Sequence, residues 1–112
     1  AGGDRDPGKR APRGAAAASG ADVVVITSDN PRTEDPSVIV AQVALGARGA
    51  RELVCLPDRT EAIAHAVRKA APEDIVLVAG KGHEDYQVVG TNRQPYSDLA
   101  QVRAALAERG RR

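Results

Sequence analysis

Three short runs of apolar, mostly β-branched residues constrain the fold of this 112-residue chain more than any other feature. They occupy residues 22–27, 52–56 and 74–79, and each run is continuous rather than alternating. Continuous apolar runs are typical of strands that are buried on both faces of a parallel sheet. The length fits one domain, so we treat residues 1–112 as a single unit built around these three strands.

Helical patterns separate and flank the apolar runs. Asp35 is placed to cap one helix, with Pro36 in its first turn, and Asp58 and Glu61 are spaced like a capping box at the start of another. The predicted helices cover residues 10–19, 36–45, 58–71 and 98–109. This alternation predicts an α/β fold, Rossmann-like, with a mostly parallel sheet, right-handed crossovers and helices on both faces.

Two further elements are expected from the turn residues. Residues 87–94 resemble a short hairpin that turns at residues 90–92. At the other end, Ala1, Gly2 and Gly3 read as the last residues of a strand, and the sequence contains no Met. We therefore expect a fragment that lacks its first strand, which would lie at the centre of a sheet ordered 3-2-1-4.

Composition and charge exclude several classes of function. The net charge of +1 gives no argument for nucleic acid as a partner, and no apolar run approaches the roughly 20 residues of a membrane span. The single cysteine, Cys55, lies in the second apolar run, where a buried structural thiol is expected. With no second cysteine and no signal-peptide pattern, the expected location is the cytoplasm.

The glycine-rich head at residues 3–9 fits the pattern G-x-x-x-x-G-K of a phosphate-binding loop. Arg10 follows it, where such a loop places Ser or Thr to bind magnesium. Three interpretations stay open for this segment: a strand-to-helix turn, an anion site unrelated to ATP hydrolysis, and a true phosphate loop.

Two polar loops follow predicted strands, at residues 28–32 and 80–86. Each alone fits an ordinary turn, but the carboxyl ends of parallel strands meet at one edge of a sheet, where ligands bind. A ligand that carries both carboxylate and ammonium groups suits the mixed charges of this edge. The charges expected at its rim are Arg5, Arg32, Lys81, Asp29, Glu84 and Asp85.

Other candidates have simpler explanations. His83 could act as a general base or only order its loop, and His65 fits a helix surface. Neither histidine has partners spaced like metal ligands. Ser97 is explained by capping of the last helix.

Four ordered segments, residues 2–10, 29–36, 79–87 and 96–98, closely resemble the C-terminal domain of the Mur ligases that add meso-diaminopimelate to UDP-N-acetylmuramoyl-L-alanyl-D-glutamate. The resemblance covers essentially the whole chain. It implies an ATP-dependent, amide-forming ligase of peptidoglycan synthesis that works through an acyl phosphate. ATP and Mg²⁺ would be bound mainly by a central domain, which the chain lacks together with the other substrate-binding domain, so the fragment alone is expected to be inactive.

The resemblance also implies roles for individual residues, none of them catalytic. The meso-diaminopimelate site would comprise Arg5, Asp29, Asn30, Arg32, Gly80 and Glu84. Within it, Arg5 would hold one carboxylate, Asn30 and Arg32 the distal carboxylate, and the Gly80 carbonyl with Glu84 the distal ammonium group. Residues approaching the nucleotide phosphates would be Asp4, Lys9, Ser97 and Asp98. The alternatives are a stand-alone nucleotide- or anion-binding module without ligase activity, and an inactive gene remnant.

Overall fold

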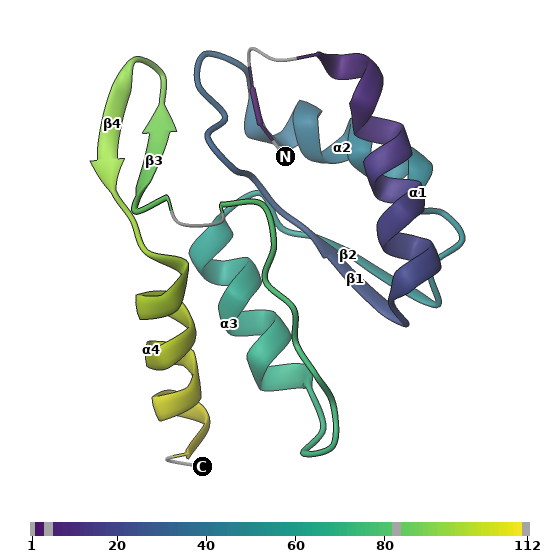
Figure 1. Cartoon of the computed structure of the whole chain (residues 1–112), viewed down its shortest axis with the longest axis vertical. Helices are drawn as coiled ribbons and strands as arrows, with labels where there is room; N and C mark the ends of the chain where they lie inside the picture. Colours follow the sequence, from purple (N-terminus) through teal and green to yellow (C-terminus); the bar gives the residue numbers. More distant parts are fainter. Residues whose placement is uncertain (1, 4–5, 82–83, 111–112) are drawn as a thin grey trace.

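Helices and strands alternate along the chain in the computed structural model (Figure 1), which describes residues 2–3, 6–81 and 84–110. In chain order the elements are η1 (Pro7–Lys9), α1 (Arg10–Gly20), β1 (Val23–Ile26), α2 (Pro36–Gly46), β2 (Glu52–Cys55), α3 (Arg59–Lys69), β3 (Tyr86–Val89), β4 (Asn92–Pro95) and α4 (Asp98–Gly110). The mixed α/β class predicted from the alternation is confirmed, and the four predicted helices are all present.

Two pairs of strands form in the described part of the chain. β1 and β2 are parallel, with Val23 opposite Glu52, whereas β3 and β4 form an antiparallel hairpin. The hairpin was predicted at this place and pairs Val89 with Asn92 across its turn. A single bridge between Arg32 and Val89 connects the loop after β1 to β3. The hairpin is thereby held beside the polar end of β1.

The hydrophobic core lies between the parallel strands and the helix pair α1 and α2. Its central buried residues are Val24, Ile26, Val40, Val43 and Ala47. Val24 and Ile26 face this core because alternate residues of a strand point to the same side. Figure 1 shows α3 on the other side of the strands with α4 beside it, so helices lie on both sides of the strands.

The helix starts follow the predicted capping. The Asp35 carboxylate accepts a hydrogen bond from the Ser37 backbone N–H (2.8 Å), and that of Asp58 accepts one from the Glu61 N–H (3.1 Å). Each bond satisfies a donor that the first turn of a helix leaves unpaired. Both caps fix where a loop ends, and the loop before α2 carries most of the site.

The third predicted strand is absent. Residues 74–79 form no ladder in the described structure, and Ile75 and Leu77 are 96 % and 86 % exposed. A strand exists through its backbone pairing, and no described segment lies alongside to provide that pairing. The apolar pattern alone was therefore insufficient to make a strand here.

The prediction of a buried Cys55 is also wrong, because its side chain is exposed. Leu53 packs against the core, but Cys55 is the last residue of β2, and the helices that cover Leu53 do not cover it. The expectation of strands buried on both faces accordingly fails for β2.

Candidate functional site

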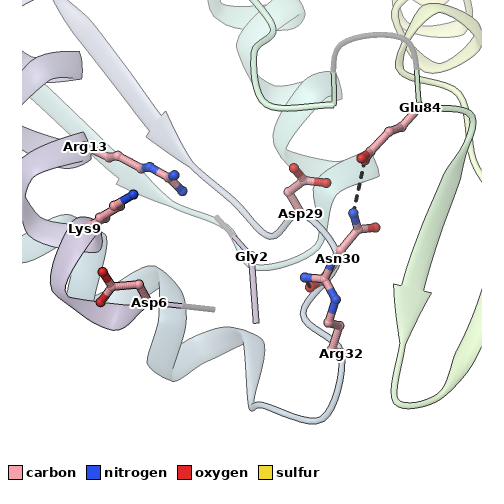
Figure 2. Close-up of a pocket in the computed structure, with 8 residues that line it drawn as sticks. All are labelled: Gly2, Asp6, Lys9, Arg13, Asp29, Asn30, Arg32 and Glu84. Atoms are coloured by element: carbon pink, nitrogen blue, oxygen red, sulfur yellow. Dashed lines mark hydrogen bonds between the residues drawn. The ribbon is translucent and has the colours of Figure 1, made fainter. Parts of the chain in front are cut away.

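A polar pocket of about 520 Å³ opens between α1 and the loop that follows β1 (Figure 2). Three of its side chains are cationic and three are anionic, with one amide among them. The residues that line the pocket are Gly2, Asp6, Lys9, Arg13, Asp29, Asn30, Arg32 and Glu84. Five of these, Lys9, Asp29, Asn30, Arg32 and Glu84, were predicted site residues, and the fold brings them together from distant parts of the chain.

The loop after β1 holds two non-glycine residues in a left-handed conformation. Asn30 has a φ of 49° and Arg32 a φ of 54°. Such angles disfavour residues with a Cβ and persist only where the surroundings impose them. The surroundings here are the hairpin: the Arg32 N–H donates to the Val88 carbonyl (3.0 Å), and the Gly90 N–H donates to the Arg32 carbonyl (2.7 Å).

Asn30 and Glu84 meet at one wall of the pocket. The Asn30 Nδ2 donates to Glu84 Oε1 at 3.1 Å, and the Tyr86 hydroxyl lies 3.4 Å from Glu84 Oε2 (Figure 2 shows the first bond). The Asn30 backbone N–H donates to Gln87 Oε1 at 3.1 Å. These bonds orient a carboxylate toward a pocket where an ammonium group can bind.

Arg32 is positioned by backbone carbonyls. Its Nη1 donates to the carbonyls of Gly3 (2.8 Å) and Asn30 (3.2 Å). Gly3 fits beside this loop because it has no Cβ: one placed there would lie 1.7 Å from the Pro31 carbonyl oxygen. The close approach of the head segment therefore holds the guanidinium at the pocket, where its planar fork can bind a carboxylate.

Lys81 occupies a different place from the one predicted. It was expected among the charges at the rim, but its side chain is 0 % exposed and forms an ion pair with Asp29 (2.9 Å). Burial of an ammonium group requires such partners, because an unpaired buried charge is strongly destabilising. Lys81 is therefore a buried residue that holds Asp29 of the pocket lining, and not a charge at the rim of the site.

The opposite wall is formed by the start of α1. Asp6 caps the Gly8 N–H through its carboxylate (2.9 Å), which places an anion where a phosphate loop would need a free donor. Lys9 and Arg13 also line this wall. The site prediction omitted Asp6 and Arg13; the four-residue spacing of Lys9 and Arg13 at a helix start was the signal that could have found Arg13.

Three predicted residues do not line the pocket. Gly80 has a φ of 115°, and a Cβ on it would lie 3.3 Å from an Asp29 carboxylate oxygen. Ser97 caps α4 through the Ala100 N–H (3.1 Å), as its simpler explanation anticipated. Asp98 forms an ion pair with the buried Arg59 (2.6 Å). Their proposed roles toward substrate or nucleotide stay predictions.

Arg59 connects the loops around the site. Its guanidinium donates to the carbonyls of Ser28 (3.1 Å) and Ala79 (3.2 Å) as well as to Asp98. Burial alone lowers the pKa of Arg59, but the hydrogen bonds and charge of Asp98 outweigh it, and the pKa lies above its usual value. Arg59 therefore stays charged, and its hydrogen bonds connect the end of β1, residue 79 and the start of α4.

Asp4, Arg5 and His83 lie outside the described residues. Within the described ranges, no group of three or more His, Cys, Asp or Glu side chains is arranged to hold a metal ion. No helix in those ranges has the length and apolar character to cross a membrane.

The fold and the pocket together define a Rossmann-like α/β domain with a mixed-charge site at the carboxyl end of its parallel strands. The chain belongs to the Mur ligase family: residues 1–82 match the family described as "Mur ligase, glutamate ligase domain". This confirms the family resemblance of the sequence motifs.

Particular relatives share one name, UDP-N-acetylmuramoyl-L-alanyl-D-glutamate–2,6-diaminopimelate ligase. The protein of that name from Acidovorax sp. (strain JS42) is 51 % identical over 97 % of this chain and 22 % of its own length. The one from Synechococcus elongatus is 54 % identical over 96 % of this chain and 22 % of its own length. A solved structure of a ligase of that name matches with a TM-score of 0.89 and 45 % identity, over 97 % of this chain and 23 % of the other. The chain thus spans about a fifth of the length of these relatives.

Proposed function

We propose that this chain is the amino-acid-recognition domain of an ATP-dependent ligase that joins meso-diaminopimelate to UDP-N-acetylmuramoyl-L-alanyl-D-glutamate during peptidoglycan synthesis in the cytoplasm. The observation that carries the proposal is the pocket, in which the Arg32 guanidinium and the Asn30–Glu84 pair lie on one loop wall. Its ligand must carry carboxylate and ammonium groups together. The shared name of the relatives supports the choice of amino acid.

The charges of the pocket match the two ends of diaminopimelate. The distal carboxylate would bind Arg32 and Asn30, with Arg5 taking the other carboxylate of the ligand. The distal ammonium group would bind Glu84 and the Gly80 carbonyl, beside Asp29. Lysine carries the same distal ammonium but no distal carboxylate, so it would leave the guanidinium unpaired in a closed site.

In this function the chain positions the nucleophile and performs no activation itself. ATP with Mg²⁺, bound by other parts of the ligase, supplies the phosphoryl group that converts the D-glutamate carboxylate into an acyl phosphate. The amine held by this domain attacks the carbonyl carbon; a C–N bond forms, phosphate leaves and the amine nitrogen loses a proton. Holding that amine in line lowers the entropic part of the barrier. Lys9, Asp4, Ser97 and Asp98 would approach the nucleotide phosphates when the domain closes.

Ligation by the longer protein that contains this chain tests the proposal. With UDP-N-acetylmuramoyl-L-alanyl-D-glutamate, ATP and Mg²⁺, we expect the tripeptide product to form with meso-diaminopimelate and far more slowly with L-lysine. The matched control is the 112-residue chain alone, which should form no product and turn over no ATP. Equal use of the two amino acids would contradict the proposed substrate, and ATP turnover by the isolated chain that is lost in Lys9→Ala would restore the phosphate-loop interpretation. None of the findings favours a stand-alone module.

A further inference from the structure

Lys81 is a buried cation that lies behind the pocket rather than in its lining. Its Nζ donates to Asp29 Oδ1 (2.9 Å), Asn30 Oδ1 (3.3 Å) and the Tyr86 carbonyl (2.7 Å). It also lies 5.6 Å from the centre of the Tyr96 ring. An ammonium group has three N–H donors and no acceptor, so these three oxygens satisfy it completely. Lys81 can therefore influence a ligand only through the residues that it holds.

The first of these residues is Asn30, whose carboxamide has one orientation. Its Oδ1 accepts from Lys81 Nζ and from the Val88 N–H (2.9 Å), and neither group can act as an acceptor. A flipped carboxamide would place its NH₂ against two donors, which is unfavourable. The Nδ2 is consequently directed to Glu84, where it donates at 3.1 Å.

The second residue is Asp29, which carries the other carboxylate on this wall of the pocket. Asp29 is paired with the Lys81 ammonium. The described partners of Glu84 are the side chains of Asn30 and Tyr86, which are both neutral. The two carboxylates line the same pocket, but the protein supplies a paired cation only for Asp29 among the described contacts. Glu84 keeps the charge that attracts a cation, and the charge of Asp29 is neutralised within the protein.

We propose that Lys81 is the positioning residue of the amino-acid site: it orients the Asn30 carboxamide and neutralises Asp29, so that Glu84 alone is left to pair with the ammonium group of the incoming amino acid. This inference rests on the proposed function. Without Lys81, Asp29 loses its ion-pair partner and becomes a second carboxylate at the pocket that competes with Glu84 for that ammonium group in a different position. The attacking amine of the amino acid would then be displaced from the activated carboxylate.

The test is steady-state kinetics of the longer ligase with Lys81→Met, a substitution of similar length that removes the charge. We expect the KM for the amino acid to rise about 10-fold or more, since a charged hydrogen bond is lost, while the KM for ATP stays unchanged. The matched control is Lys69→Met, because Lys69 is an exposed lysine at the end of α3 and lies outside the pocket lining. Both KM values should be unchanged in that variant.

A double variant separates positioning from a merely structural role. Adding Asp29→Asn to Lys81→Met removes the carboxylate that has lost its ion-pair partner, so the KM for the amino acid should recover by several-fold, but not completely, from that of the single variant. An unchanged amino-acid KM in Lys81→Met, or equal KM values in the single and double variants, would overturn the proposal. If the single variant fails to fold, the double variant decides: it still lacks the Lys81 bond that orients Asn30, so its KM for the amino acid should exceed that of wild type while its KM for ATP is unchanged, and an amino-acid KM equal to wild type would overturn the proposal.

The amino acid that the wild-type ligase uses is established first, and all KM values refer to that amino acid. A wild-type enzyme that uses another amino acid would contradict the proposed substrate, yet the role of Lys81 would still be measured with the amino acid that it does use.

Discussion

At the scale of single residues, the site depends on backbone angles and contacts that few side chains tolerate. Asn30 and Arg32 adopt positive φ on either side of Pro31, and both are tied to the hairpin by backbone or side-chain bonds. Strain of this kind costs about 1–3 kcal/mol per residue and persists at functional sites because the fold compensates for it. The loop is thus held in place before any ligand binds, which suits the proposed function of distinguishing amino acids by the position of one carboxylate.

Arg32→Ala in the longer ligase should change the choice of amino acid. Loss of one partner of a buried charge pair costs about 3–5 kcal/mol, so kcat/KM for meso-diaminopimelate should fall by about 10²- to 10³-fold. Use of lysine should fall far less, because lysine has no distal carboxylate for Arg32 to bind. The measurement is kcat/KM for both amino acids.

Glu84→Ala is the matched comparison for that variant. Both amino acids carry the distal ammonium group, so this substitution should lower kcat/KM for both of them. If Arg32→Ala lowers kcat/KM for the two amino acids by the same factor, Arg32 only supports the Asp29–Pro31 turn, and its proposed role in selecting the amino acid is wrong.

At the scale of elements, two glycines allow α1 and α2 to pack closely. A Cβ on Gly14 would lie 2.0 Å from the Val43 carbonyl oxygen, and one on Gly46 would lie 1.7 Å from that of Ala11. Each glycine therefore meets the backbone of the facing helix. The close packing fixes α1, which carries Arg13 of the pocket lining, against α2, which follows the loop of Arg32.

Gly46→Ala should separate the two helices and destabilise the domain. Overpacking of this kind costs about 1–3 kcal/mol, which lowers the melting temperature by several degrees. Gly20→Ala is the control, because nothing lies within 4 Å of a Cβ at Gly20, and it should leave the melting temperature nearly unchanged or raise it slightly. Thermal unfolding of the two variants side by side gives the comparison; equal melting temperatures would show that the helices can move apart without cost.

At the scale of the whole molecule, the apolar residues that no described element covers are the most informative feature. Val23 of β1 is 50 % exposed, and Ile75 and Leu77 are almost fully exposed. Arg59 nevertheless holds the ends of both segments, through Ser28 and Ala79. A strand that entered between them would complete the sheet in the order expected from the sequence.

Extension of the chain upstream by about ten residues of the parent sequence should therefore raise its stability. The added strand would bury Ile75 and Leu77, which are 96 % and 86 % exposed, and burial of such a side chain stabilises a fold by about 1.5–3 kcal/mol. The melting temperature of the extended chain should exceed that of the 112-residue chain, whereas an extension of the same length in Gly and Ser should have no effect.

Leu77→Ser provides a second readout of the same arrangement. It should be nearly neutral in the 112-residue chain, where Leu77 is 86 % exposed, and clearly destabilising in the extended chain, where a neighbouring strand would bury it. Equal effects of Leu77→Ser in both chains would show that no strand forms there.

The sequence by itself determined the local elements and most of the site. Apolar periodicity and the caps at Asp35 and Asp58 predicted the four helices, because these signals act within one helical turn. The motif around Asn30 and Arg32 and the one containing Glu84 predicted the residues of the pocket wall, although Arg59 and the bonds of Asn30, rather than a third described strand, bring the two segments together.

Only the tertiary structure decided the rest. Residues 74–79 form no strand without a partner, and Cys55 is exposed because the cover over Leu53 does not extend to the end of β2. Lys81 is a buried support rather than a rim charge, because two of its three acceptors, Asp29 and Asn30, lie 52 and 51 residues away in the chain. Pairing, burial and long-range hydrogen bonds depend on such distant segments meeting, and no local pattern in the sequence records that meeting.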